Sequence, residues 1–89
     1  MSDKDFAKLR ISRAYFNLMC LPEGDARMIS LAWIGNYEIR MLEPSSTSSD
    51  DAALFLIELF DYDAGSTVDL CVCYAIEEGA VAFEAFVSR

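Results

Sequence analysis

Two acidic residues in the segment 61–65 have the alternate spacing at which carboxylates bind a hard cation. Asp61, Asp63 and Gly65 match the start of a calcium loop, in which carboxylate oxygens surround Ca²⁺. A complete EF-hand loop also needs a polar ligand at its fifth position and a glutamate at its twelfth, where this chain has Gly65 and Val72. We therefore predict a hairpin turn with solvated carboxylates and no metal site.

Cys71 and Cys73 are separated by one residue, which places both thiols on the same face of a β-strand. Paired thiols bind soft metals, but a closed zinc site requires four ligands. The chain has no histidine and only Cys20 remains, so carboxylates would have to complete such a site. The spacing also differs from the Cys-x-x-Cys of redox proteins. We therefore predict small buried hydrophobic residues and no cofactor.

Glu58 interrupts an apolar stretch, and Asp69 lies in the next predicted strand. If these strands pair, the two carboxylates approach each other, and close carboxylates with separated pKa values perform acid–base chemistry. The alternative is that both carboxylates point to solvent or meet Arg40. We favour this alternative because most acidic residues in strands are exposed.

Other signals for catalysis are weak or absent. The lack of histidine excludes Ser-His-Asp and Cys-His mechanisms and imidazole metal sites. No glycine-rich phosphate loop, nucleophile elbow or kinase signature is present. Arg10 and Arg13 share a helix face and could clamp an anion, but offsetting the acidic surface is the favoured interpretation. We predict no catalytic residue.

The composition points to one small, acidic domain over residues 1–89. The chain has 7 basic and 15 acidic residues, a net charge of −8, which argues against nucleic-acid binding. Apolar residues make up 54% of the chain, which excludes disorder and exceeds what a small core hides. Excess apolar surface indicates a partner, most often a second copy of the same chain.

The sequence predicts a cytoplasmic location without membrane attachment. The apolar run at residues 52–57 has six residues, whereas a membrane-spanning helix needs about 20. The N-terminal residues lack the basic and apolar regions of a secretory signal. Three cysteines, an odd number, fit a reducing compartment better than a disulfide framework.

Residues 3–13 are predicted to form a helix, whereas residues 14–20 fit either its continuation or a strand. Ser2 and Asp5 have the spacing of a capping box, and residues 22–25 read as a turn. The predicted apolar arc of this helix contains Leu9, Ile11, Tyr15, Phe16, Leu18 and Met19, and the opposite arc contains Arg10, Arg13, Ala14 and Asn17.

Residues 28–34 and 37–43 are predicted to form a hairpin around Gly35 and Asn36, a pair that suits a type II′ turn. Because residues 28–34 are apolar on both faces, we predict that they form the more central strand. The predicted cross-strand pairs are Ile34 with Tyr37, Trp33 with Glu38, Ala32 with Ile39, Leu31 with Arg40, Ser30 with Met41 and Ile29 with Leu42.

Residues 53–60 and 67–74 are predicted to be the third and fourth strands, after a polar loop at 44–51. The final segment, 75–88, is predicted to be a helix. On the fourth strand, Val68, Leu70 and Val72 should face one way and Thr67, Asp69, Cys71 and Cys73 the other. The apolar face of the final helix should contain Ile76, Ala80, Phe83 and Val87.

These elements predict an α+β fold in the order α-β-β-β-β-α. We expect a four-stranded antiparallel sheet with the N-terminal and C-terminal helices packed on one face. The other face would be exposed and would carry Trp33 and the stripe formed by Cys71 and Cys73.

Three stretches, Ile29–Met41, Glu58–Asp69 and Ile76–Ser88, resemble short bacterial proteins of uncharacterised function and about this length. The resemblance spans most of the chain but includes no catalytic motif. It implies a bacterial, intracellular, stand-alone domain and assigns no site residues.

Our first functional hypothesis is a non-enzymatic protein–protein interaction module. Its expected partners are a second copy of the same chain, in a homodimer, and a basic protein attracted by the acidic surface. The second is a small-molecule-binding protein or carboxylate-based enzyme, with a site between sheet and helices that uses Glu58, Asp69 and an arginine. A third, an acidic mimic of nucleic acid, rests on net charge alone. The candidate partner-binding residues are Trp33, Tyr37, Arg40, Glu58 and Asp69.

Overall fold

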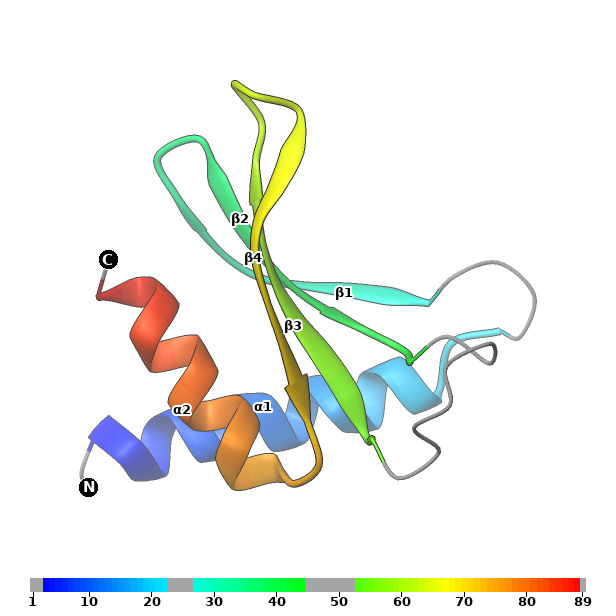
Figure 1. The fold of residues 1–89 in the computed structure, drawn as a ribbon. Helices are drawn as coiled ribbons and strands as arrows, with labels where there is room; N and C mark the ends of the chain where they lie inside the picture. The colour runs from blue at the N-terminus through cyan, green and yellow to red at the C-terminus, as the bar shows by residue number, and fades with distance from the viewer. Residues whose placement is uncertain (1–2, 23–26, 45–52, 89) are drawn as a thin grey trace.

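The computed structural model describes residues 3–22, 27–44 and 53–88 (Figure 1). The predicted capping-box residue Ser2, most of the turn at 22–25 and most of the loop at 44–51 lie outside the described residues. The elements are α1 (Asp3–Met19), β1 (Met28–Ile34), β2 (Tyr37–Leu42), β3 (Phe55–Asp61), β4 (Ser66–Cys73) and α2 (Ile76–Val87).

The predicted α+β fold with a four-stranded antiparallel sheet is confirmed. The strand order is β1-β2-β3-β4, and both helices pack on one face of the sheet, where the core lies (Figure 1). The prediction that residues 28–34 form a central strand is wrong, because β1 is at the edge. Its apolar residues on the second face, Met28 and Trp33, are exposed instead of covered.

The hairpin between β1 and β2 turns at Gly35, which has φ +60°, and the next residue, Asn36, does not have a positive φ. A type II′ turn requires both of these features. The three predicted pairs nearest the turn are confirmed. A bulge then places Leu31 outside the register, so the remaining predicted pairs are wrong and Ser30 pairs with Arg40. Leu31 is buried on the helix side, and its carbonyl accepts a hydrogen bond from Arg10 of α1.

A second bulge changes the orientation predicted for the start of β4. Leu59 pairs with Asp69 and Phe60 pairs with Thr67, so Val68 is the extra residue. Thr67 therefore faces the open side of the sheet, where its hydroxyl meets Glu58. Val68 lines a pocket on the helix side. Val68 therefore faces the side opposite to Leu70 and Val72, and Thr67 faces the side opposite to Asp69, Cys71 and Cys73, so the prediction grouped both with the wrong residues of the strand.

The helix α1 continues to Met19, which resolves the ambiguity over residues 14–20. Its buried residues are Ala7, Ile11, Ala14 and Leu18, at a spacing of four, three and four. The predicted apolar arc is therefore wrong in part, because Ala14 is buried and Phe16 is 68% exposed. In α2 the buried residues are Gly79, Ala80, Ala82 and Phe86, whereas Val87 is exposed.

Gly79 brings α2 into close contact with both β3 and α1. A Cβ atom added there would lie 2.5 Å from Phe55 Cζ and 3.0 Å from Ile11 Cγ2. Both neighbours are fully buried, so neither side chain has free space into which to move. The missing side chain at position 79 thus sets how closely the two helices pack beneath the sheet.

We predict that Gly79→Ala lowers the free energy of unfolding by about 1–3 kcal/mol, because overpacking outweighs the gain of about 1 kcal/mol in helix propensity. Urea denaturation measures the change. Val81→Ala, at an exposed position of the same helix, should change stability little. An alanine variant at 79 as stable as the wild type would contradict this packing.

Candidate interaction face

The sheet face opposite the helices, here called the open sheet face, is built from three cross-strand rows. One row is wholly apolar, the middle row is mixed, and the third row contains two aromatic residues. In strand order, the rows are Met28-Leu42-Leu56-Val72, Ser30-Arg40-Glu58-Leu70 and Trp33-Glu38-Phe60-Thr67.

Arg40 lies at the centre of this face and is bound on three sides. Its Nε donates to Glu38 Oε1 at 2.5 Å, and its Nη1 donates to Glu58 Oε1 at 3.2 Å. Its Nη2 donates to the hydroxyl of Tyr62 at 2.7 Å, and that hydroxyl donates in turn to Glu38 at 2.9 Å. The second oxygen of Glu58 accepts the Thr67 hydroxyl at 2.6 Å. The network leaves the guanidinium fixed in position.

Aromatic rings cover the same guanidinium. Arg40 lies 4.2 Å from the centre of the Phe60 ring and 5.5 Å from that of Tyr62, within cation–π range. Tyr62 also contacts Trp33 and Phe60, with ring centres 4.9 Å apart in both pairs. These rings exclude water from the ion pairs and create a rigid aromatic surface in which Trp33 remains 57% exposed.

Glu38 is 5% exposed and ionised inside this network. Burial opposes its ionisation, but hydrogen bonds from Ser30, Arg40 and Tyr62 outweigh that effect and hold the pKa of Glu38 below its usual value of 4.5. Burial also opposes the charge of Arg40, but Glu38 and Tyr62 outweigh it and raise the pKa of the guanidinium. The pair is therefore charged at neutral pH.

Three of the five predicted partner-binding residues, Trp33, Arg40 and Glu58, lie together on the open sheet face. Tyr37 lies on the opposite side of the sheet, in a pocket with Phe86. Asp69 lies on that side too, in register with Leu59.

The hypothesis that Glu58 and Asp69 approach each other is wrong. Glu58 pairs with Leu70, and because alternate residues of a strand point to opposite faces, Asp69 points away from Glu58. Glu58 instead meets Arg40, as the alternative interpretation predicted. The structure therefore gives no basis for a carboxylate pair that performs acid–base chemistry with these two residues.

Sequence reasoning missed three residues of the face: Glu38, Phe60 and Tyr62. A signal was present, because Glu38 and Arg40 are two apart in one strand and so share a face. Glu38 was assigned only to a cross-strand pair with Trp33. The burial of a charged residue on an uncovered sheet face requires the surrounding rings, which strand periodicity does not reveal.

The segment 61–65 forms a hairpin turn, as predicted. The Asp61 carboxylate accepts the backbone N–H groups of Asp63 and Ala64, and Gly65 has φ +66°. Asp63 accepts a hydrogen bond from Asn36, which joins the two hairpin tips. Within residues 3–22, 27–44 and 53–88, no group of three or more Cys, Asp and Glu side chains is placed to hold a metal ion.

The predicted cysteine stripe on the open face is wrong, because Cys71 and Cys73 lie on the helix side. Cys73 is fully buried and Cys71 packs against the core. Burial and the neighbouring Cys71 raise the pKa of the Cys73 thiol to about 12, so it is protonated at neutral pH. The prediction that these residues pack as small hydrophobic side chains is therefore confirmed for Cys73.

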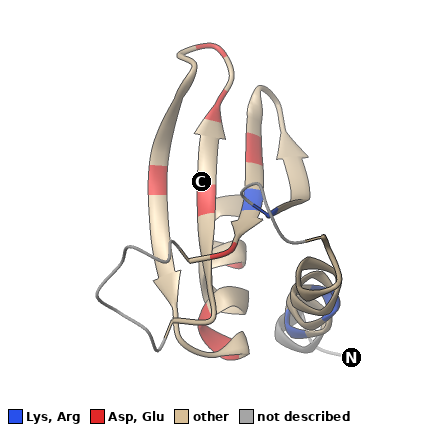
Figure 2. Cartoon of the chain, turned by 90° about the vertical axis from the view of Figure 1, so that its right-hand side faces the viewer, with Lys and Arg blue, Asp and Glu red and all other residues tan. Residues whose placement is uncertain are grey.

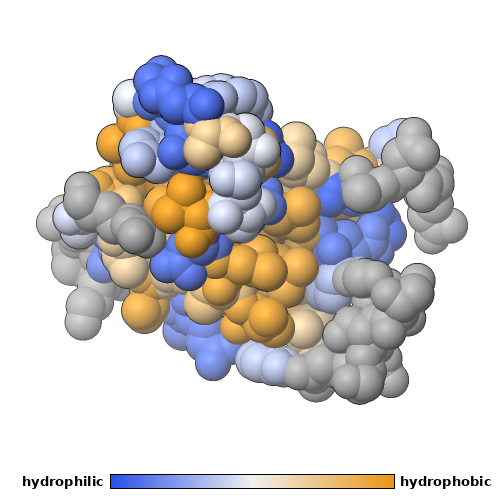
Figure 3. Space-filling view, turned by 45° about the horizontal axis from the view of Figure 1, so that its top comes forward, coloured by the Kyte–Doolittle hydropathy of each residue, from blue (hydrophilic) through white to orange (hydrophobic). Residues whose placement is uncertain are grey.

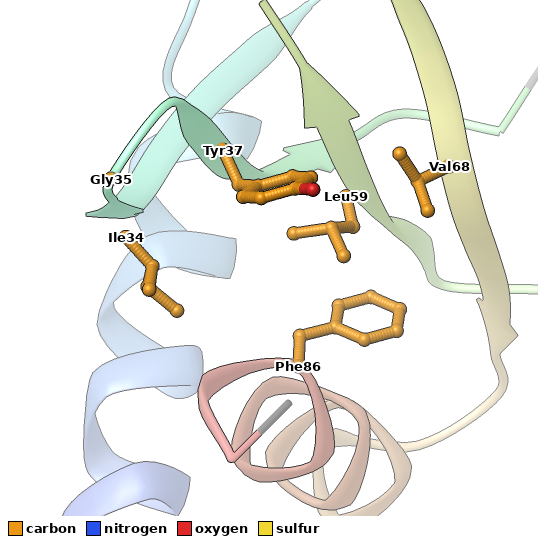
Figure 4. A pocket seen from close by; sticks show the side chains of 6 residues that line it. All are labelled: Ile34, Gly35, Tyr37, Leu59, Val68 and Phe86. Atoms are coloured by element: carbon orange, nitrogen blue, oxygen red, sulfur yellow. The ribbon is translucent and has the colours of Figure 1, made fainter.

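A pocket of about 360 Å³ opens on the helix side, near the hairpin tips (Figure 4). The Phe86 ring points from α2 toward Leu59, and Tyr37 and Val68 lie around them. None of the pocket's described lining residues is charged, and the Tyr37 hydroxyl is the polar side-chain group among them. The pocket therefore suits a small apolar or aromatic molecule.

The surface combines unevenly placed charge with exposed apolar area. Basic residues gather on α1, and acidic residues lie along the strands and at the start of α2 (Figure 2). Apolar side chains form a broad area on the molecular surface (Figure 3). In the part of the chain that the structure describes, no helix is both long and apolar enough to span a membrane.

Comparisons with protein-family models, curated proteins and solved structures found no match for this chain. The resemblance to short bacterial proteins therefore stays a prediction. The open sheet face and the pocket are the two features whose geometry bears on function.

We predict that Glu38→Gln lowers the free energy of unfolding at pH 7 by about 1–3 kcal/mol, because Arg40 loses a buried partner. The folded-state pKa of Glu38 lies below 4.5, so its stabilisation is present above that pH and is lost as the pH falls through the folded value. Denaturation between pH 2 and 7 should therefore show a flatter acid limb for Glu38→Gln.

The matched control is Asp63→Asn, which neutralises an exposed carboxylate of a turn. Its loss of stability at pH 7 should be smaller than that of Glu38→Gln. Equal stability of Glu38→Gln and the wild type across this pH range would show that the ion pair does not stabilise the fold.

Proposed function

We propose that this chain is a small, acidic, non-enzymatic protein–protein interaction module that forms a homodimer through its open sheet face. The observation that carries the proposal is that this face combines paired charges with accessible apolar residues. Its charges are paired with one another, and its apolar residues remain accessible, Trp33 at 57%, Leu70 at 50% and Met28 at 43%. Exposed apolar area of this kind marks an interaction surface, and the paired charges within it need no further partner.

The arrangement of charge supports a second copy as the occupant. We consider two copies stacked with their open sheet faces together and related by a two-fold axis between the two sheets, parallel to the strands and midway between β2 and β3. This axis places Arg40 of each copy opposite Glu58 of the other. The same rotation sets Leu42 opposite Leu56 and Met28 opposite Val72. Opposite charges and apolar rows therefore meet, in an aligned sheet packing at a separation of about 10 Å.

The size of the face sets the expected strength of this dimer. Four strands about 4.8 Å apart, with a rise of about 3.3 Å per residue, present roughly 400 Å². A standard interface buries about 800 Å² per partner, so we expect a weak, reversible dimer with a Kd of roughly 10–100 µM.

We predict that Trp33→Glu weakens dimerisation at least tenfold, because it places a charge in the apolar contact. Met28→Glu, at the other end of the same strand, should have the same effect. Phe16→Glu is the matched control, since Phe16 is 68% exposed on α1 and lies off the face. Sedimentation equilibrium from 5 to 500 µM measures each Kd. A wild-type chain that is monomeric at 500 µM overturns the homodimer.

The proposal includes a cytoplasmic location in a bacterium. The odd number of cysteines supports a reducing compartment. The bacterial origin rests on the resemblance of three stretches of the chain to short bacterial proteins.

A second candidate function, binding of a small molecule, is favoured by the pocket around Phe86. Its volume of about 360 Å³ lies within the range of ligand sites, and its walls come from both sheet and helix. A planar apolar molecule with one hydrogen-bonding group fits this lining, because the Tyr37 hydroxyl offers a single polar contact.

We predict that indole and phenol cause saturable shifts in the methyl NMR signals of Leu59 and Ile34. Val68→Trp should abolish these shifts, because the larger side chain fills the pocket. Val87→Trp adds the same ring at an exposed position outside the pocket and should leave them unchanged. An absence of saturable shifts for either compound in the wild type argues against this second function.

A further inference from the structure

The strand β4 forms one edge of the described sheet and directs backbone groups outward. The Cys73 carbonyl faces inward, because it accepts the N–H of Leu54 at 2.9 Å. The Leu70 N–H points away from β3 and donates to the Asp69 carboxylate at 2.8 Å. Since inward and outward positions alternate along an antiparallel strand, Val72 also directs its backbone outward.

The opposite edge of the sheet is closed to a further strand at its middle. The bulge at Leu31 interrupts the regular spacing of β1, and Arg10 occupies the carbonyl of Leu31. On β4 the bulge lies near the hairpin tip, at Val68, and the stretch from Leu70 to Cys73 stays in register. This stretch is therefore the regular edge among the described strands.

A groove of about 600 Å³ runs beside this edge, between β4 and α2. Val81, Ala82 and Ala85 of α2 form its apolar floor, and Val81 is 67% exposed. The charged residues among its described lining are all acidic: Asp69, Glu77 and Glu78.

We infer that the β4 edge and this groove bind an extended segment of a second protein, in which basic and apolar residues alternate. The segment would add a fifth, antiparallel strand to the sheet. Its apolar side chains would lie beside Leu70 and Val72, and its basic side chains would lie beside Asp69 on the groove side. The inference rests on the proposed function, because it names a partner for an interaction module.

Charge selects this occupant over a second copy. Two β4 strands paired across a two-fold axis would bring two identical acidic grooves together, and like charges across an interface destabilise it. Lysine or arginine side chains instead complement Asp69 and Glu78, while their aliphatic stems pack on Val81 and Ala85. Glu77 is already paired with Lys8 of α1 at 3.1 Å. A basic partner is also attracted by the net charge of −8.

Asp69 links the charge of the partner to pairing of the backbone. Its carboxylate holds the Leu70 N–H, a group that the carbonyl of a fifth strand would use. A basic side chain beside Asp69 draws the carboxylate into an ion pair and leaves this N–H to the partner. An uncharged segment would have to displace the carboxylate without that compensation, so the edge selects against neutral strands.

The test uses a synthetic ten-residue peptide in which lysine alternates with valine, and a control peptide of equal composition with the lysines in one block. Isothermal titration calorimetry measures affinity, and amide hydrogen exchange by NMR measures protection of Leu70 and Val72. We expect the alternating peptide to bind at least tenfold more tightly than the block peptide, to protect both amides and to weaken in salt. Equal affinities, or binding without amide protection, overturn the inference.

Two matched pairs of variants locate the site. Asp69→Lys should weaken the alternating peptide at least tenfold, whereas Asp63→Lys, with the same change in charge, should not. Val81→Arg should weaken binding likewise, whereas Val87→Arg, on the same helix outside the groove, should not. An alternating glutamate–valine peptide should bind Asp69→Lys more tightly than the wild type. Equal losses of peptide affinity within each pair would assign binding to net charge alone and overturn the assignment of the peptide to this groove.

The same titration in Trp33→Glu separates this inference from the homodimer, because Trp33 lies on β1 at the opposite edge. Peptide binding that persists in that variant, with protection of the Leu70 and Val72 amides, supports the groove whether or not the wild type dimerises. A wild type that dimerises but does not bind the alternating peptide overturns the groove and leaves the homodimer standing.

Discussion

Arg40 holds the open sheet face together. Among the described residues, both helices pack on the other face of the sheet, so the side chains of the open sheet face themselves exclude water there. A buried carboxylate such as Glu38 is costly unless it is paired and hydrogen-bonded. Arg40 supplies both conditions, and the rings of Phe60 and Tyr62 cover the pair. Removing the guanidinium would leave Glu38 and Glu58 close together without a countercharge.

The element order and the turns of this fold follow from local chemistry that a sequence displays. A glycine that must adopt positive φ marks the first hairpin at Gly35, and a cluster of turn residues marks the second at 61–65. The antiparallel pairing within each of these two hairpins then follows from its short connection. The extension of α1 to Met19 depends on packing against α2 and the sheet, so strand-like alternation in residues 14–20 left it ambiguous.

The two bulges explain why side-chain orientation was harder to predict than secondary structure. An extra residue in one strand reverses the face of every residue beyond it. At Leu31 the extra residue is accommodated because α1 buries its side chain and Arg10 binds its carbonyl, and both contacts come from a segment distant in sequence. At Val68 the cause is equally tertiary, because Phe86 of α2 lies beside it. Strict alternation therefore grouped the residues from Asp69 to Cys73 correctly but failed at Thr67 and Val68.

The members of the candidate site were predictable where residue type identified them. They were not predictable where membership depended on which face of the sheet a side chain points to. Trp33 is large and apolar on a strand opposite an acidic residue, and Glu58 and Arg40 are charges on neighbouring strands, so their proximity follows from pairing. Tyr37 and Asp69 were grouped with them on residue type, but the pleat places both on the helix side.

The two proposed interaction surfaces meet at Leu70 and Val72, which lie on the open sheet face and also at the outer edge of the sheet. A fifth strand beside β4 would extend the apolar rows by one side chain each. A wider face buries more area when two copies pack together. The area buried per copy is what limits the affinity of the proposed dimer. Binding of the basic segment and dimerisation would then favour each other, because a coupling free energy between two sites is reciprocal. The acidic groove and the open sheet face thus have different partners but share a boundary at Leu70 and Val72, and binding at one surface would affect the other there.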